Sequence, residues 1–162
     1  MTELNKDKLL EIFEYKNGEL FWKKPFGKKT KVGQKAGSKQ SLGYLQVSIN
    51  KKKYLLQRII FVMHHGYFPK EVDHINGVKS DNRIENLRDV TRSQNINNKS
   101  KPITNTSGTK NVYFHPSRNK WQVKLFIHGV SKSFGYYDDL ELATLVSQEA
   151  RNKYHGEYAC HK

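Results

Sequence analysis

The stretch Glu71-Val72-Asp73-His74-Ile75-Asn76-Gly77 places a carboxylate and an imidazole side by side at the end of a short predicted strand. Asn76-Gly77 is a turn signal, because both residue types tolerate the backbone conformations of tight turns. A second short strand is predicted up to Val90, and Thr91 is a suitable N-cap for a helix after it. The pattern therefore predicts two strands joined by a loop and followed by a short helix.

The predicted helix is rich in asparagine, which is a mediocre helix former. Helix propensity therefore does not account for the asparagines, and the alternative to a functional role is that Asn-rich segments are usually loops. If the two strands and the helix fold back on one another, Asn95 comes near Asp73 and His74.

These residue types match the needs of phosphodiester hydrolysis. A hard divalent cation must neutralise charge on the phosphate and the leaving oxygen, and the oxygens of Asp73 and Asn95 suit Mg²⁺ or Mn²⁺ better than zinc. A base with a pKa near neutrality must take a proton from water, and His74 can do so. Asn86 is the candidate for the polar residue that orients this imidazole. We therefore predict Asp73 and Asn95 as metal ligands, and His74 and Asn86 as catalytic residues.

The run Asp73-His74-Ile75-Asn76-Gly77, followed by Asp81-Asn82-Arg83, Asn86-Leu87-Arg88 and Asn95, resembles the HNH nucleases with a ββα-metal motif. It is similar to the phage and intron-encoded homing endonucleases of that family. In them the aspartate and a helix asparagine or histidine bind the metal, the histidine after the aspartate is the general base, and the middle asparagine fixes the loop. The resemblance spans roughly residues 44–98 and implies the same roles here.

The chain is strongly basic, with 29 Lys and Arg against 15 Asp and Glu and a formal net charge of +14. Acidic residues are missing from Leu20 to Lys70 and from Val90 to Tyr137, which hold twelve and eight Lys or Arg residues respectively. Two acid-free basic stretches predict two surfaces that face a polyanion, and we expect double-stranded DNA. Net charge that serves only solubility is the alternative.

Composition also excludes several classes of protein. The single cysteine, Cys160, excludes an internal disulfide and any zinc site with two or more thiolates. No apolar run is long enough for a transmembrane helix, and the first residues lack the apolar core of a signal peptide. We expect a cytoplasmic protein, in the host cell if phage-encoded, with no membrane partner and no small-molecule cofactor beyond the metal.

Local patterns predict the elements on the N-terminal side of the Asp-His block. Apolar spacing from Lys6 to Tyr15 predicts a helix, and Glu19 to Trp22 a short strand. Residues 23–40 are rich in lysine and glycine and are predicted to form a basic loop. Alternation over residues 44–57 predicts a hairpin, and residues 58–65 a helix.

A new pattern of alternating apolar and polar residues begins after an Asn-, Ser- and Thr-rich segment. Alternating residues predict three strands, at residues 112–115, 121–127 and 131–136. Asp138 or Asp139 is then predicted to cap a helix that continues to about Tyr154.

Several short motifs lie in order along this C-terminal segment: Ser107-Gly108, Val112-Tyr113, Lys120-Trp121, Phe134-Gly135-Tyr136-Tyr137, Ala143, Ala150 and Tyr154-His155-Gly156-Glu157-Tyr158-Ala159. Together they resemble an AP2/ERF domain. The resemblance implies a three-stranded sheet that lies in the DNA major groove, with a helix packed behind it. The residues expected to face DNA are Lys110, Tyr113, His115, Lys124 and Phe126.

The predicted fold class is α+β. Residues 1–98 form a basic N-terminal region and an HNH ββα-metal nuclease domain, and residues 99–106 form a linker. Residues 107–162 form an AP2/ERF-like domain, a three-stranded antiparallel sheet packed on one helix. The DNA contacts predicted in the first domain are Lys23, Lys24, Lys28, Lys29, Lys31, Lys51, Lys52, Lys53, Arg58 and Arg83.

The predicted function is site-specific cleavage of DNA by an HNH homing-type endonuclease that uses Mg²⁺ or Mn²⁺ and acts as a monomer. A dimer remains an alternative, because one metal site per chain cuts one strand. A catalytically inactive DNA-binding regulator and an RNA-binding protein are the alternative functions.

Overall fold

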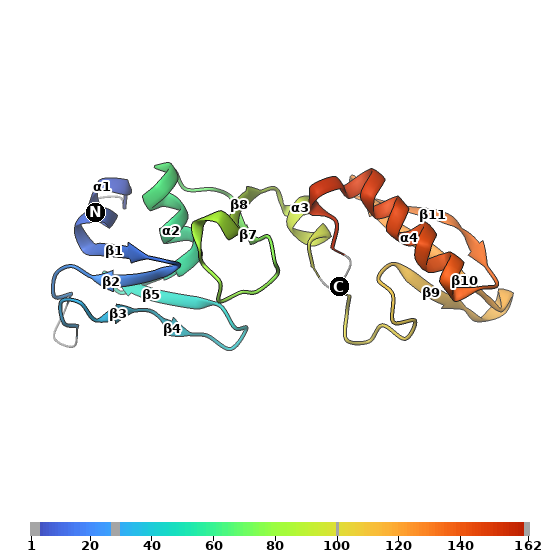
Figure 1. Ribbon diagram of the computed structural model, residues 1–162, viewed down its shortest axis with the longest axis horizontal. Coiled ribbons are helices and arrows are strands. Elements are labelled where there is room, and N and C mark those ends of the chain that lie inside the picture. The colour runs from blue at the N-terminus through green and yellow to red at the C-terminus, as the bar shows by residue number, and fades with distance from the viewer. Residues whose placement is uncertain (1–3, 27–29, 100, 161–162) are drawn as a thin grey trace. The chain divides into compact units, whose positions relative to one another are not determined.

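The computed structural model describes residues 4–26, 30–99 and 101–160 (Figure 1). Contacts divide the chain into two compact units, Met1–Val90 and Thr91–Lys162, each with its own hydrophobic cluster. No helix in the described ranges is long and apolar enough to cross a membrane.

This division falls earlier than the linker at 99–106 that the sequence predicts. The reason lies in the helix that carries Asn95, which contacts residues of the second unit. The ammonium of Lys110 donates hydrogen bonds to the backbone carbonyls of Asn97, at 2.7 Å, and of Lys99. The end of this helix is therefore fixed to the second unit.

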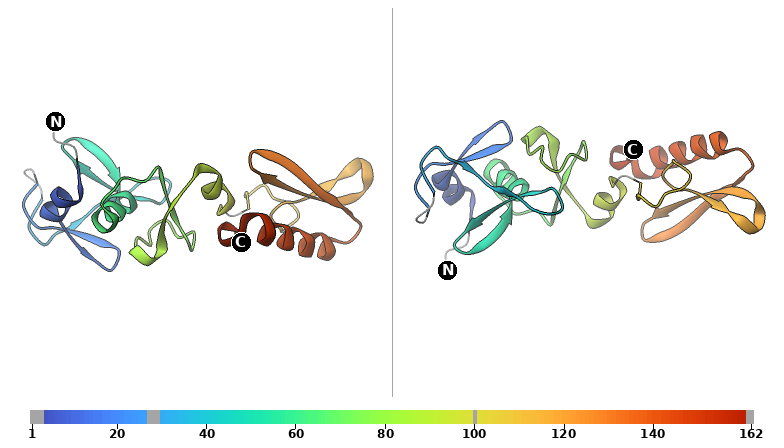
Figure 2. Two further views of the ribbon diagram at one scale, coloured as in Figure 1. Left: turned by 90° about the horizontal axis from the view of Figure 1, so that it is seen from above. Right: turned by 90° about the horizontal axis from the view of Figure 1, so that it is seen from below.

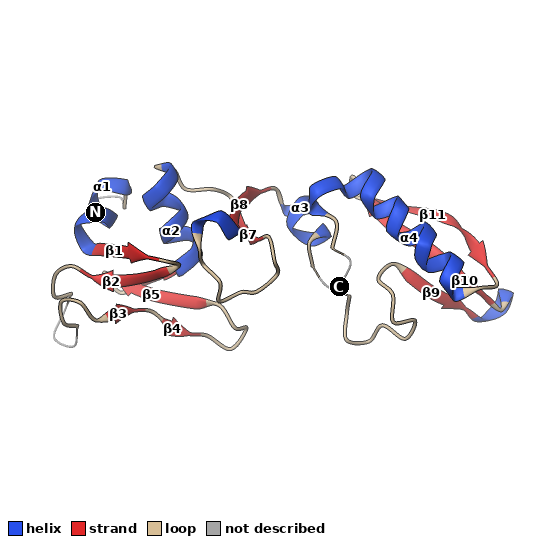
Figure 3. Cartoon of the chain, in the orientation of Figure 1, coloured by secondary structure: helices blue, strands red, loops and turns tan. Residues whose placement is uncertain are grey.

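The first unit combines short helices with three antiparallel sheets, ordered β1-β2-β3, β4-β5-β6 and β7-β8 (Figure 3). Its elements in chain order are α1 (Lys6–Ile12), β1 (Phe13–Lys16), β2 (Glu19–Trp22), β3 (Lys35–Ala36), β4 (Ser38–Lys39), β5 (Leu45–Ile49), β6 (Lys52–Leu55), α2 (Leu56–His65), β7 (Glu71–His74), η1 (Ile84–Asn86) and β8 (Leu87–Val90). Two of these strands, β3 and β4, lie within the predicted basic loop, so that prediction was incomplete.

The first helix is shorter than the sequence predicts. Asn5 caps it through its side chain, which accepts a hydrogen bond from the backbone N–H of Lys8 at 3.1 Å. The backbone is extended at Phe13 (φ −122°, ψ 148°), and the chain turns back through Asn17-Gly18 to pair β1 with β2. Strand pairing therefore overrides the helical periodicity beyond Ile12.

Helix α2 forms the centre of the first unit. Most of its side chains are buried, and it ends at Gly66, whose left-handed backbone (φ 84°) lets its N–H reach the carbonyl of Val62 at 2.8 Å. The hairpin before it is confirmed as β5 and β6, joined by Asn50-Lys51 with both residues at positive φ. The Lys51 position favours glycine, so this tight turn carries some backbone strain.

The N-terminal hairpin contacts the segment between β7 and β8. The Tyr15 hydroxyl accepts a hydrogen bond from the backbone N–H of Ile84 at 3.1 Å. Gly18 lies so close to this segment that an added Cβ would sit 2.8 Å from the backbone nitrogen of Arg83. The hairpin therefore supports the loop in which the candidate site residues lie.

The second unit is a three-stranded antiparallel sheet, ordered β11-β10-β9, with a long helix along one face (Figure 2). Its elements are α3 (Arg92–Asn97), β9 (Val112–His115), η2 (Pro116–Arg118), β10 (Lys120–Ile127), β11 (Val130–Tyr137), α4 (Leu140–His155) and η3 (Gly156–Tyr158). Asp139 caps α4 by accepting from the N–H of Glu141 at 2.8 Å. Small side chains at Ala143 and Ser147, both fully buried, let the helix approach the sheet closely.

Candidate nuclease site and nucleic-acid surface

The loop between β7 and β8 is held by the side chain of Asn86. Its Oδ1 accepts from the backbone N–H of Asn76 at 3.0 Å, and its Nδ2 donates to the Asn76 Oδ1 at 3.1 Å and to the Asp81 carbonyl at 2.8 Å. Asn86 is 7% exposed, so these polar atoms are satisfied inside the protein rather than by bulk water. Asn86 therefore fixes the loop.

Asp81 makes a second set of hydrogen bonds within the same loop. It accepts from Arg83 Nε and Nη2, both at 2.8 Å, and from Asn76 Nδ2 at 2.7 Å. The Arg83 guanidinium is the main cause that holds the pKa of Asp81 well below its usual range. Arg83 was predicted as a DNA contact, but its guanidinium is engaged by this carboxylate.

His74 lies at the end of β7 and is buried, with 4% of its surface exposed. Its Nε2 is 2.9 Å from the Oδ1 of Asn82, which is also buried. An amide oxygen only accepts hydrogen bonds, so Nε2 carries the hydrogen and the lone pair of the neutral ring is on Nδ1. Asn86 was predicted to orient this imidazole; that prediction was wrong, because Asn82 makes the hydrogen bond.

Burial is the main influence on the His74 imidazole and lowers its pKa below the ordinary value of 6.5. The Asn82 hydrogen bond and the charges of Asp73 and Asp81 oppose this effect. The net lowering favours the neutral ring at pH 7, which is the form that can accept a proton.

Asp73 precedes His74 and is buried beside Arg88 of the neighbouring strand. Arg88 donates from Nε at 3.0 Å and from Nη2 at 2.9 Å, both to Oδ2 of the carboxylate. The two residues are directly opposite in the β7–β8 register. The guanidinium therefore balances the carboxylate charge and restricts its rotation. The pairing of Arg88 with Asp73 was not predicted from the sequence, because only the strand register reveals it.

Asn95 lies in α3, within the second unit. A capping box starts this helix: Thr91 accepts from the N–H of Gln94, and the Gln94 side chain accepts from the N–H of Thr91. The predicted pairing of Asn95 with Asp73 on one ion stays a prediction. Among the described residues there is no group of three or more His, Cys, Asp or Glu side chains that could hold a metal ion.

Comparison with known proteins adds independent information. Residues 54–96 match a family model described as HNH endonuclease. Protein 3.8 of Escherichia phage T7 is 30% identical over 94 residues, which are 58% of this chain and 74% of that protein. The chain belongs to the family of this phage protein, and residues 54–96 are an HNH endonuclease domain. No solved structure matches the chain.

The HNH domain extends from β6 through α2, β7 and β8 into α3. It includes Asp73, His74, Asn86 and Asn95, and also Asn82 and Arg88, the two partners that the structure adds. An HNH domain indicates a nuclease or a DNA-related role, and it therefore supports the predicted DNA chemistry at the level of the family.

Those predicted DNA contacts of the first unit that the structure describes fall into two groups. Lys31, Lys51, Lys52 and Lys53 are exposed. The others are engaged by the protein: Lys23 donates to the Leu10 carbonyl, Lys24 is 3.4 Å from Glu11, and Arg58 donates to the Lys70 and Pro69 carbonyls. Lys28 and Lys29 lie outside the described residues.

In the second unit, four of the five predicted DNA contacts share the sheet face opposite to α4. Register pairs place Tyr113 opposite Gln122 and His115 opposite Lys120, and the exposed Lys124 and Phe126 continue this face along β10. Gln122 also donates to the Tyr136 hydroxyl at 3.0 Å, and Arg118 lies 4.4 Å from the Tyr136 ring centroid. Arg118 and Tyr136 were not predicted, because a turn and a third strand bring them to the face. Gln122 lies on β10 with Lys124 and Phe126 and was not named as a DNA contact, although the alternation along that strand places it on the same face.

Lys110 does not belong to this face. Its ammonium donates to the Asn97 and Lys99 carbonyls, and burial lowers its pKa. The prediction that Lys110 contacts DNA conflicts with these bonds, because its charge serves to anchor α3.

Replacing Asn86 with alanine should lower the free energy of unfolding by about 2–4 kcal/mol, because it removes three hydrogen bonds and leaves the partly buried N–H of Asn76 without this acceptor. Urea denaturation measures the change. Ser80→Ala, at an exposed position of the loop between β7 and β8, is the matched control and should have little effect. A loss for Asn86→Ala no larger than for Ser80→Ala would contradict the assigned role.

Proposed function

We propose that the protein is a site-specific DNA endonuclease of the HNH homing type, which hydrolyses phosphodiester bonds with one divalent cation. The observation that carries the proposal is the buried pair of Asp73 and His74 inside the segment that matches the HNH endonuclease model. An Asp-His pair that is adjacent only by chance on the surface would not be buried, because buried charged and titratable side chains cost free energy unless they have partners.

Asp73 and Asn95 are the proposed ligands of the cation. Their oxygen atoms fit Mg²⁺ or Mn²⁺, and Mg²⁺ commonly binds through one or two protein groups while it keeps several waters. When bound, the cation supplies electrostatic stabilisation of the phosphate and of the departing oxygen. Arg88 holds one oxygen of Asp73, so the carboxylate keeps a defined orientation.

His74 is the proposed general base. Its Nδ1 would take a proton from the attacking water, and the Asn82 amide would keep the ring in the tautomer that allows this. Asn82 is therefore a positioning residue, and Asn86 acts one step further away by shaping the loop that carries it.

DNA would be bound by two surfaces. Exposed lysines of the first unit, Lys31 and Lys51 to Lys53, would contact phosphates, which gives affinity without sequence preference. The face with Tyr113, His115, Lys124 and Phe126 would read base edges in the manner of an AP2/ERF-like sheet. Amide and aromatic side chains on that face, Gln122 among them, are suited to base edges.

Cleavage of supercoiled plasmid that carries the DNA surrounding the gene tests the proposal. We expect Mg²⁺-dependent nicking or linearisation at one site, located by sequencing the new ends. Binding should weaken steeply as salt rises, with a log–log slope of about −0.9 per phosphate contact. A flat salt response would contradict the charge argument, and competition by RNA as strong as by duplex DNA would favour RNA binding.

A catalytically inactive DNA-binding regulator is the second candidate. The observation that favours it is the ion pair between Asp73 and Arg88, because a carboxylate already neutralised by arginine has less need of a cation. This alternative requires tight and specific DNA binding without cleavage in either Mg²⁺ or Mn²⁺.

A further inference from the structure

An exposed lysine is held next to the candidate site by two independent contacts. Lys79 lies in the β7–β8 loop, and its Nζ donates to the backbone carbonyl of Leu42 at 3.0 Å. The same Nζ lies 5.0 Å from the centroid of the Tyr44 ring, within the range of a cation–π interaction. Because both contacts act on the ammonium, the lysine side chain is pre-positioned.

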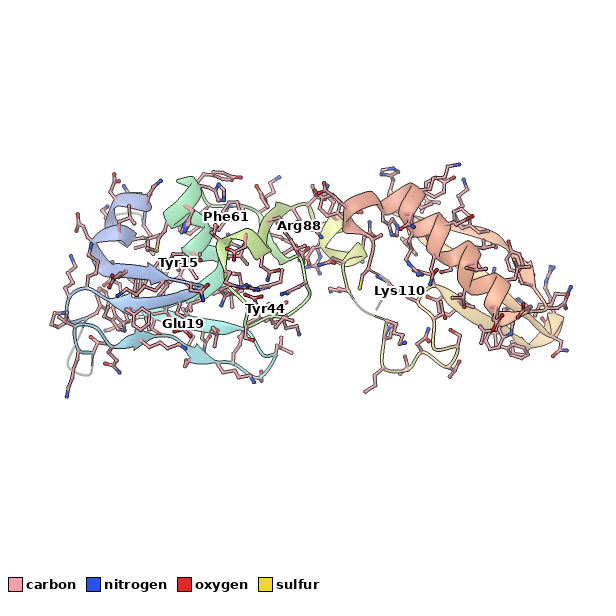
Figure 4. The ribbon with its side chains drawn as sticks, in the orientation of Figure 1. Tyr15, Glu19, Tyr44, Phe61, Arg88 and Lys110 are labelled. Atoms are coloured by element: carbon pink, nitrogen blue, oxygen red, sulfur yellow. The ribbon has the colours of Figure 1, made fainter. Side chains whose placement is uncertain are left out.

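Tyr44 connects this lysine to the general base. Its ring centroid is 6.0 Å from that of the His74 imidazole, with a tilt of 40° between the planes. Figure 4 labels Tyr44, which precedes β5, and Arg88 on β8, the strand that pairs with the strand carrying His74. One aromatic ring is therefore in contact range of both the Lys79 ammonium and the proposed general base.

The charge of Lys79 is not compensated by a carboxylate within the described part of the chain. Several other cations of the first unit have such partners: Lys16 with Glu14, Lys24 with Glu11, Lys35 with Glu19, Arg83 with Asp81 and Arg88 with Asp73. A fixed, exposed and uncompensated ammonium beside a nuclease site is suited to an anion supplied by the substrate.

We propose that Lys79, placed by Tyr44, binds the DNA backbone phosphate next to the scissile bond and so seats the cleaved strand against His74. This inference rests on the proposed nuclease function and adds a substrate contact to it. The cation and the His74 imidazole would contact the scissile phosphate itself. Lys79 is separated from His74 by the Tyr44 ring, so it is assigned to a neighbouring phosphate. Lysine acts there as a point charge and reads no base sequence.

Such a contact should affect the rate of cleavage of bound DNA more than the affinity. We expect Lys79→Gln to lower the single-turnover rate at saturating enzyme by about ten- to a hundredfold, the range for a charge-assisted hydrogen bond. Lys79→Arg should retain most of the rate because it keeps the charge. Lys39→Gln, which neutralises an exposed lysine on β4, is the control and should cleave like the wild type.

DNA with one neutral methylphosphonate linkage beside the cut identifies the phosphate. The wild type should lose rate on this substrate by a factor similar to the Lys79→Gln loss, and Lys79→Gln should show no further loss. A purely structural role for Lys79 would instead lower the melting temperature and leave Lys79→Gln as sensitive to the neutral linkage as the wild type.

Tyr44→Leu should lower the rate in the same way, and the double variant with Lys79→Gln should be no slower than the slower single variant, because both act on one contact. If the wild type cleaves and Lys79→Gln cleaves equally fast, this inference is overturned and the nuclease function stands. If the wild type binds DNA and never cleaves it, the nuclease function fails and the inference fails with it.

Discussion

Replacing His74 with alanine should reduce DNA cleavage by about 10²- to 10⁴-fold, the usual contribution of a general base. The imidazole is the group beside Asp73 that is neutral near pH 7 and can take a proton from water. DNA affinity should be retained, because the exposed lysines and the C-terminal sheet face are unchanged. Single-turnover cleavage in Mg²⁺ and a gel-shift assay measure the two properties.

The alanine variant also removes the partner of the buried Asn82, so it can lose stability as well as activity. His74→Gln separates these effects, because its amide N–H can still donate a hydrogen bond while the base is absent. His65→Ala, at the exposed end of α2, is the matched histidine control. Cleavage that persists in a folded His74→Gln variant would reject the assignment of the base.

Replacing Asp73 with asparagine should remove most of the affinity for Mn²⁺ and reduce cleavage by about 10²-fold or more, because a neutral amide is a weaker ligand for a hard cation. Electron paramagnetic resonance of Mn²⁺ gives the affinity without reference to activity. Stability should also fall, by about 1–3 kcal/mol, because the Arg88 guanidinium loses a charged acceptor in a largely buried position.

Asp89→Asn is the control for this change, since Asp89 is an exposed aspartate on the same sheet and its carboxylate accepts a hydrogen bond from Tyr67 at 3.0 Å. Its Mn²⁺ affinity should equal that of the wild type. Equal Mn²⁺ binding by the wild type and Asp73→Asn would remove Asp73 from the metal site.

Elements with a strong periodic pattern were predicted well from the sequence. The β5–β6 hairpin, helix α2 and the strands and helix of the second unit all follow from alternation or from clear start and stop signals. The helix predicted to reach Tyr15 was too long, because its last residues pair with β2. The strands β3 and β4 are two residues each and left no recognisable pattern.

The residue types of the candidate site could be predicted, but not all of their contacts. Both Asn82 and Asn86 were visible in the motif, and only the folded loop decides which of them reaches His74. Long basic side chains were the least predictable, because sequence gives their charge and not their direction. Arg83 and Lys110 both satisfy groups of the protein itself.

The contacts of Tyr15 and Gly18 with residues 83 and 84 bear on the design of shortened versions of this protein. The segment that carries the family signature begins at residue 54, yet Leu9, Phe13 and Leu20 share its apolar interior. A fragment restricted to residues 54–96 would lose part of that interior and the contacts that support the loop between β7 and β8. Transfer of residues 54–96 into another protein therefore requires the preceding residues that complete this apolar interior.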